Sequence, residues 1–355
     1  MAKTNLKTFP LNSLEEGQEY DEHLASFPDN PFYKKELLIP NLPKDGELFY
    51  FILEEEGTPM ALMPFFKRKI FRNRELTPYF DISSPYGYSG PLFCREASEK
   101  TKASFWAQVD NWHKKNNIIT EFMRFSLQKN WEGYNGELVA TLKNVCGKIR
   151  PELEQWENFK PKVRNNFRRA VKSGLTSKVY FEEIDKEIIS QFCAIYHGTM
   201  ERRNAGEQYF QTQEYFSDLI NKNPKSIAIA MIYKGDIPVS TELLLLSEEV
   251  LFSYLGGTNA AYFSLRPNDM LKIEVLNWGR KNGYKHYCLG GGRMEGDSLY
   301  KYKKNFFPKD EDLVFHTGRK ILNQQIYKEL FEINPFCVDC PVTFFFPKYR
   351  CNELC

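Results

Sequence analysis

The chain has 355 residues, of which 42% are hydrophobic and 26% charged, so it has ample material for a buried core. The formal net charge of +2 is too small for the whole molecule to act as a polyanion binder, so a nucleic-acid contact requires a local basic patch. No apolar run has the length of a signal peptide or a membrane-spanning helix, which predicts a cytoplasmic protein without an integral membrane segment.

The first half of the chain predicts a mixed arrangement of strands and a helix. Apolar runs at residues 47–53 and 60–66 flank the turn-forming segment EEEGT and predict an antiparallel hairpin. Residues 118–127 predict a further strand, and the segment 96–115, rich in Trp and Ala, predicts a helix before it. We therefore expect a mixed α/β domain over residues 1–150.

The second half predicts an antiparallel meander followed by a helix and a strand. Three apolar runs, at residues 226–233, 237–246 and 250–258, are separated by the turns KGD and SEE. The amphipathic segment 266–283 then predicts a helix that ends at a glycine, and residues 285–292 return as a strand. This second domain is expected to span residues 151–330, with a cysteine-rich tail at 331–355.

A basic segment opens the second half. Residues 158–180 contain seven Lys or Arg and no acid, and Arg164, Arg168 and Lys172 are spaced to lie on one ridge of a helix. One interpretation is a solvated basic face. The other is a site for a phosphate-rich ligand, such as the diphosphate of a nucleotide-sugar or lipid-linked acceptor, or the acceptor stem of a tRNA.

The eight cysteines fall into two groups. Four are scattered through ordinary globular sequence, as reduced and buried cysteines of an intracellular protein usually are. The other four crowd the end of the chain in two closely spaced pairs: Cys337, Cys340, Cys351 and Cys355. Four thiolates can hold a structural zinc ion, but the connection between the pairs is short and VTFFF within it is typical of a buried strand, so unligated thiols are favoured and a zinc site is the alternative.

One carboxylate stands in an apolar strand. Glu242 lies within IPVSTELLLL, where a charge is costly to bury unless it is paired. It is either a general base with a raised pKa, suited to deprotonate an incoming ammonium, or a structural carboxylate bonded to an arginine such as Arg266 or to backbone amides. Asp297 is a second candidate acid. No metal-ligand or triad spacing of histidines appears, so direct attack without a covalent enzyme intermediate fits best.

Several motifs in order carry a family resemblance. The segments KVRNNFRRAVKSG, TMERRNAGEQYF, VSTELLLL, YLGGTNAAYFSLRPNDMLKIEVLNWG, LGGG and DSLYKYKKNF together resemble the Fem-type branch of the GNAT acyltransferase superfamily, whose members include peptidoglycan aminoacyltransferases. The resemblance implies two tandem GNAT-like domains, each with a mostly antiparallel mixed sheet flanked by helices. It places the acyl donor where neighbouring strands splay, and names aminoacyl-tRNA or acyl-CoA as that donor.

The resemblance also implies roles for individual residues. In Fem relatives an arginine of a T-x-x-R helix helps to hold the acceptor phosphates, and here TMER places Arg202 at that position, with Tyr209 nearby. The family pattern further places Tyr302 and Lys303 where relatives use an aromatic–lysine pair. The lysine lies against the reacting carbonyl there, where a cation stabilises the developing oxyanion. Gly291, in the triple glycine before this pair, is expected to let the backbone approach substrate closely.

Three functions are therefore open. The first is an aminoacyl or acyl transferase that forms an amide on an amine of a cell-wall or surface-polysaccharide precursor, with peripheral association at the inner membrane face. The second is an acyl-CoA-dependent N-acyltransferase of a nucleotide-linked amino sugar. It is disfavoured because the segment at residues 264–271 lacks the glycines and has Pro267 where a pyrophosphate loop is needed. The third is a non-catalytic GNAT-like module that binds a nucleotide-sugar or RNA.

Overall fold

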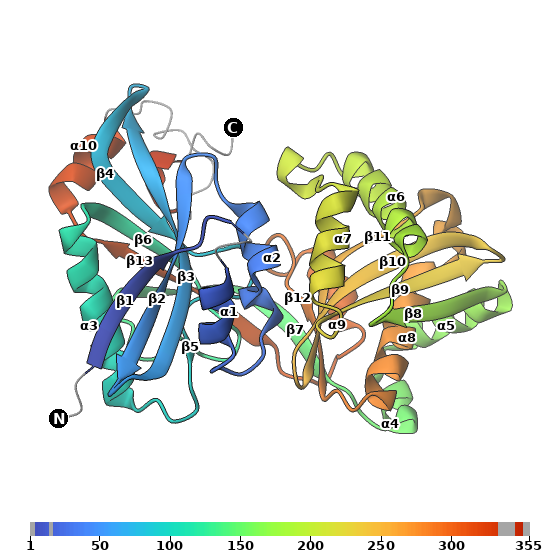
Figure 1. Ribbon diagram of the computed structural model, residues 1–355. Coiled ribbons are helices and arrows are strands. Elements are labelled where there is room, and N and C mark those ends of the chain that lie inside the picture. Colours follow the sequence, from blue (N-terminus) through green and yellow to red (C-terminus); the bar gives the residue numbers. More distant parts are fainter. Residues whose placement is uncertain (1–3, 14–16, 333–344, 351–355) are drawn as a thin grey trace. The chain divides into compact units, whose positions relative to one another are not determined.

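The computed structural model describes residues 4–13, 17–332 and 345–350 of the chain (Figure 1). It divides into two compact units. The first unit contains residues 1–28, 32–141 and 315–355, and the second contains residues 29–31 and 142–314. Within the described residues, no helix is long and apolar enough to cross a bilayer.

The first unit is built on a mixed sheet. Its strand order is β1-β2-β3-β4-β6-β13-β7 with β5 on β3, where the strands are β1 (Thr4–Pro10), β2 (Gly46–Glu55), β3 (Thr58–Arg72), β4 (Glu75–Ser83), β5 (Leu92–Phe93), β6 (Ile118–Arg124), β7 (Glu137–Lys148) and β13 (Leu313–Ile321). Its helices are α1 (Gln18–Leu24), α2 (Lys35–Leu38), α3 (Glu99–Lys115) and α10 (Gln324–Glu332), with a short 3-10 turn η2 (Ile39–Asn41). The hairpin expected from the first half of the sequence is β2 and β3.

The second unit has a sheet of the order β7-β12-β11-β10-β9-β8. Its own strands are β8 (Leu175–Phe181), β9 (Ile227–Lys234), β10 (Ile237–Leu246), β11 (Val250–Thr258) and β12 (His286–Gly290). Its helices are α4 (Glu152–Asn158), α5 (Pro161–Lys172), α6 (Lys186–Arg202), α7 (Gln213–Lys222), α8 (Pro267–Lys281) and α9 (Ser298–Lys304), with 3-10 turns η1 (Pro31–Tyr33, at the boundary between the units), η3 (Glu207–Tyr209) and η4 (Ala260–Leu265). The predicted meander is β9, β10 and β11.

Both units repeat one pattern of strand pairing. Four antiparallel strands are followed by a helix and then by a strand parallel to the fourth, which is β6 beside β4 in the first unit and β12 beside β11 in the second. The mixed α/β class and the tandem arrangement predicted from the sequence are therefore confirmed.

In each unit, the strand that pairs with the parallel strand, β6 or β12, comes from the other half of the sequence. Strand β7 follows β6 in the chain but pairs with β12, whereas β13 follows β12 and pairs with β6. Along the chain, the boundaries between the units therefore fall at residues 141/142 and 314/315, whereas the sequence predicted 150 and 330. The first boundary lies within β7, and the second lies within β13, whose larger part belongs to the first unit.

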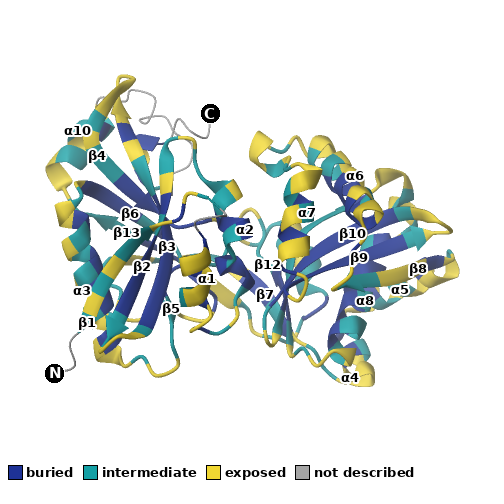
Figure 2. Cartoon of the chain, in the orientation of Figure 1, coloured by how far each residue is buried: buried dark blue, intermediate teal, exposed yellow. Residues whose placement is uncertain are grey.

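Each unit has its own core. In the second unit, residues of β9 and β10 are almost entirely buried, and apolar side chains of α8 pack with them into one cluster. In the first unit, β2, β3, β6 and α3 form a second cluster rich in aromatic rings. Figure 2 shows these central strands as buried and the outward faces of helices such as α5 and α10 as exposed. Burial of such apolar surface is the main favourable term in folding.

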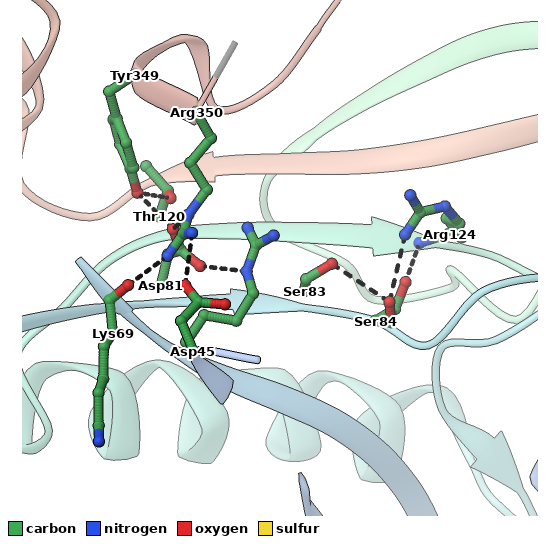
Figure 3. A network of polar contacts seen from close by, with 10 residues as sticks. Asp45, Lys69, Asp81, Ser83, Ser84, Thr120, Arg124, Tyr349 and Arg350 are labelled. Carbon is green, nitrogen blue, oxygen red and sulfur yellow. Dashed lines mark hydrogen bonds and ion pairs between the residues drawn. The ribbon is translucent and has the colours of Figure 1, made fainter. Parts of the chain in front are cut away.

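A buried ionic network binds Tyr349 and Arg350, near the end of the sequence, to β4 of the first unit (Figure 3). Asp81 on β4 is fully buried, and its two oxygens accept hydrogen bonds from Arg68 Nε at 2.7 Å and Arg350 Nε at 2.5 Å. Tyr349 also donates to Asp81 at 3.0 Å, and its hydroxyl lies 2.8 Å from that of Thr120. Because a buried carboxylate is stable only when it is paired, Asp81 makes residues 349 and 350 part of this unit.

We predict that Asp81→Asn lowers the free energy of unfolding by about 3 kcal/mol, because it removes the fully buried carboxylate that pairs with the half-buried Arg68 and the buried Arg350, while Arg350 keeps its ion pair with Asp45. Chemical denaturation monitored by circular dichroism would measure the change. Glu132→Gln is the matched control, since it breaks the ion pair of Lys102 with a half-exposed Glu132 and should change the stability by less than about 1 kcal/mol. Equal effects of the two substitutions would contradict the assigned role of Asp81.

Candidate active site in the second unit

Strands β11 and β12 of the second unit separate after a short parallel pairing. Their register runs only from Val250↔His286 to Phe252↔Cys288, although β11 continues to Thr258. Residues 253–257 are half-buried, whereas residues 239–246 of the neighbouring β10 are buried. A bulge lies at the same place, because Leu243 pairs with Leu255 and Leu244 with Ser253, leaving Tyr254 as the extra residue. Bulges of this kind re-aim side chains and end strand pairing next to active sites.

A buried ion pair lies beside this separation. Glu242 on β10 is 1% exposed, and its two oxygens accept hydrogen bonds from Lys272 Nζ at 2.6 Å and from Tyr287 Oη at 2.7 Å. Lys272 also donates to Ser253 Oγ, at 3.0 Å, on the first β11 residue beyond the pairing with β12. The expectation that an arginine such as Arg266 pairs with Glu242 is wrong, because helix α8 directs Lys272 to the carboxylate instead.

The backbone of the triple glycine binds the Lys303 side chain. Gly290 has a positive φ of 74°, a conformation that L side chains rarely adopt, and it turns the chain out of β12. The carbonyl oxygen of the next glycine, Gly291, accepts a hydrogen bond from Lys303 Nζ at 2.7 Å. Burial, with a further contribution from the nearby Lys272 ammonium, lowers the pKa of Lys303 to about 8. Lys303 is thus a half-buried amine that is mostly protonated at neutral pH.

Asp297 fixes the loop that carries these glycines. Its side chain is the N-cap of α9, accepting hydrogen bonds from the backbone amides of Tyr300 at 2.7 Å and Arg293 at 2.7 Å. These bonds lower the pKa of the Asp297 carboxyl, which therefore stays ionised. The residue thus positions α9, and with it Lys303, relative to the end of β12.

Tyr302 connects this helix to the start of α8. Asn268 Nδ2 donates to Tyr302 Oη at 2.9 Å. Burial, followed by the nearby carboxylates of Asp269 and Glu242, raises the pKa of Tyr302, so it stays a neutral phenol. Asp269 is itself buried and accepts a hydrogen bond from Asn166 of α5 at 3.0 Å. The first turn of α8 therefore already carries a carboxylate, and Pro267 at its start has no N–H to offer.

Arg202 lies at the opposite end of β11 from its pairing with β12. It is the last residue of α6, and its Nη1 donates to the carbonyl of Thr258 at 3.1 Å while its guanidinium carbon stands 5.0 Å from the ring centre of Phe263. Helix α6 approaches β11 closely there, since a Cβ on Gly257 would lie 2.7 Å from the carbonyl oxygen of Ile195. Tyr209 follows as a half-buried residue of η3.

The predicted basic helix is α5, and its arginines have local partners. Arg164 Nη1 donates to the carbonyl oxygens of Trp156, at 3.3 Å, and Phe159, at 2.7 Å, at the end of α4. Arg168 Nη1 donates to Asn165 Oδ1, and its guanidinium stacks over the ring of Trp156. These contacts account for part of the charge on this face without a ligand.

Sequence reasoning missed several residues of this cluster. Lys272, Tyr287, Ser253 and Asn268 come from three different elements; Asn268 and Lys272 lie within a segment that carries the family resemblance, but the resemblance assigned neither a role. Lys272 carried one usable signal, since it interrupts the apolar face of the predicted helix, and Glu242 on the earlier strand β10 needs a cation. The four cysteines considered for zinc, at 337, 340, 351 and 355, lie outside the described residues. Within the described residues, no group of histidine, cysteine and acidic side chains is arranged to hold a metal ion.

Comparison with known proteins identifies the fold of this unit. Residues 161–304 match the family model described as an acetyltransferase (GNAT) domain. This segment contains Glu242, Lys272 and Lys303 and runs through β8–β12 to the last residue of α9. No curated protein matches the sequence.

The whole chain resembles solved structures. The crystal structure of FemX has a TM-score of 0.64 and 12% identity, and the match covers 88% of this chain and 98% of that one. The structure of L-PGS from Bacillus licheniformis has a TM-score of 0.58 and 13% identity, with 88% of this chain and 93% of that one covered. A tandem GNAT protein from the clavulanic acid pathway has a TM-score of 0.50 and 6% identity, with 90% and 99% covered. Residues 161–304 thus form a GNAT domain, and the chain shares its fold with FemX and with a tandem GNAT protein.

We predict that Glu242→Gln lowers the free energy of unfolding by about 3 kcal/mol, because Lys272 loses its buried counter-ion. Adding Lys272→Met to this variant should recover most of the loss, since it removes the uncompensated charge as well. Asp218→Asn, which breaks the exposed ion pair with Lys222, is the control and should cost less than about 1 kcal/mol. Strictly additive effects of the two core substitutions in denaturant titrations would show that the pair is not coupled.

Proposed function

We propose that the protein is an acyltransferase that forms an amide bond, with an aminoacyl or acyl group as donor and an amine of a cell-wall or surface-polysaccharide precursor as acceptor. The observation that supports this most is the Lys303 amine, held at the end of β12 beside the point where β11 and β12 separate. Proteins of the GNAT fold place the acyl donor at such a separation. The likeness of the chain to FemX and to L-PGS supports a transfer of this general kind.

In the proposed reaction the neutral acceptor amine attacks the carbonyl carbon of the donor ester. A C–N bond forms and electrons move onto the carbonyl oxygen; the carbonyl then re-forms as the C–O bond to the leaving group breaks. The nitrogen loses one proton, and the leaving oxygen gains one to become a hydroxyl. Lys303 as an ammonium stabilises the negative oxygen, and it does so strongly because it is already desolvated. The bond to Gly291 fixes the amine before substrate arrives, which avoids reorganisation during the reaction.

Glu242 enters this proposal as a residue with two possible tasks. It positions Lys272, whose ammonium contributes to the lowered pKa of Lys303. It would serve as the base for the acceptor ammonium only after giving up the hydrogen bond from Lys272 or from Tyr287. Arg202 and Tyr209 remain the proposed contacts of the acceptor phosphate, and Arg164 and Arg168 would join them only by leaving their present partners.

The start of α8 favours an aminoacyl-tRNA donor over coenzyme A. A pyrophosphate binds well at a helix start that offers free N–H groups and a positive dipole end. Here Pro267 removes one donor, and the buried Asp269 carboxylate adds negative charge to the same turn. The match of residues 161–304 to an acetyltransferase domain favours the alternative, an acyl-CoA-dependent N-acyltransferase of a nucleotide-linked amino sugar.

We expect Lys303→Ala to reduce kcat by about 100-fold, because removing one oxyanion-stabilising group costs about 3 kcal/mol, while acceptor binding is retained. The wild-type rate should fall as pH rises through the Lys303 pKa of about 8, since the neutral amine cannot stabilise an oxyanion. In Lys303→Arg any residual activity should persist to higher pH, because arginine stays charged. Steady-state rates between pH 6 and 10, with the exposed Lys301→Ala as control, would measure this.

A donor experiment tests the proposal as a whole. Purified protein is incubated with charged tRNA or with acyl-CoA, each together with nucleotide-linked amino sugars or muropeptide precursors, and products are weighed by mass spectrometry. We expect a product with the mass of a new amide from aminoacyl-tRNA. Turnover with the thioester alone would favour the N-acyltransferase alternative. Binding of acceptor without turnover from any donor would support the non-catalytic module instead.

A further inference from the structure

Two cysteines that are far apart in the sequence face each other in the second unit. Cys146 on β7 is the register partner of Cys288 on β12 in an antiparallel pair. Neither forms a disulfide bond; Cys288 is buried and Cys146 is half-buried. The sequence placed both among scattered, unreactive cysteines because 141 residues separate them, and only the crossing of β7 into this sheet brings them together.

The pairing places the two Cα atoms at disulfide distance. The backbone amide of His286 donates to Glu249, at the start of β11, so His286 and Cys288 direct their backbone groups away from β7. The amide of Lys148, the partner of His286, likewise bonds elsewhere, to Asp310. Cys146 and Cys288 therefore form a non-hydrogen-bonded pair, in which Cα atoms are about 4.5 Å apart and side chains are closest. Disulfides need Cα separations of about 4.4–6.8 Å.

The two side chains also interact. A hydrogen bond with Cys288 is the largest cause of the raised pKa of Cys146, ahead of burial. The two side chains therefore interact directly across the paired strands. Nearby, Cys288 also interacts electrostatically with Lys303, so this pair lies next to the candidate active site.

We propose that Cys146 and Cys288 are an oxidation site that closes reversibly into a cross-strand disulfide. With a peroxide as oxidant, the two S–H bonds and the O–O bond break, one S–S bond forms, and two water molecules are released. With a small disulfide as oxidant, exchange through one mixed disulfide gives the same bond and two free thiols. The half-buried Cys146 is the entry point, because Cys288 is covered.

The disulfide would change the position of the Gly291 carbonyl that binds Lys303. Its effect on transfer rests on the proposed function. The loop after β12 lies against β7, since a Cβ on Gly291 would be 3.1 Å from the carbonyl oxygen of Lys143. Any change in the spacing of β7 and β12 at residues 146 and 288 is therefore transmitted to the Gly291 carbonyl that holds Lys303. Small displacements of a positioned catalytic group are costly, so oxidation should slow transfer by about ten-fold or more.

Peptide mapping tests the bond without reference to activity. The reduced, folded, full-length protein is treated with hydrogen peroxide or diamide, alkylated under denaturing conditions and digested with trypsin. We expect the peptide of residues 144–148 joined to that of residues 286–293, with the loss of two hydrogen atoms, and its disappearance after treatment with dithiothreitol. The Cys193→Ser variant should give the same crosslink, whereas Cys146→Ser should not.

Two outcomes would overturn the inference. Recovery of both peptides in separately alkylated form after oxidation of the folded protein would show that the thiols do not join. A crosslinked protein with an unchanged transfer rate would remove the coupling to Lys303. Failure of the proposed transferase activity leaves the mapping result intact, so the two proposals can be rejected independently.

Discussion

The hydrogen bond from Lys303 to the Gly291 carbonyl is the interaction on which the proposed site depends. It holds a charged amine in a desolvated position at the end of β12, where burial and Lys272 lower its pKa to about 8. The bond exists because a glycine with positive φ turns the chain at residue 290 and because Asp297 caps the helix that carries the lysine. A cation prepared in this way stabilises negative charge better than one that must first leave water.

The pairing pattern of the sheet explains why the site is where it is. In the second unit, β11 has antiparallel pairing with β10 along its length but parallel pairing with β12 over three residues only. Past that point, β11 carries the bulge at Tyr254, and Lys272 links its Ser253 to Glu242 on β10. The strand that completes this sheet, β7, comes from the other half of the chain. The same crossing creates the cysteine pair and the support of the Gly291 loop.

The sequence predicted the architecture well because its signals are local. The meander, the helix after it and the returning strand each have an apolar period and turn residues that identify them within 10 to 20 residues. Lys303 could be singled out from its neighbours Lys301 and Lys304, and Tyr302 placed beside it, only through the order of several motifs. The partners of Glu242 could not be found, because Lys272 and Tyr287 approach it through tertiary packing. The crossing of β7 and β13 also left no local signal, which is why the limits of the units differ from those expected.

A structure of the protein with a bound non-hydrolysable donor analogue would test the central claim most directly. The account predicts that the carbonyl oxygen of the analogue lies about 3 Å from Lys303 Nζ, beside the separated ends of β11 and β12. An analogue bound with its carbonyl remote from Lys303, with that amine still directed only to Gly291, would contradict it.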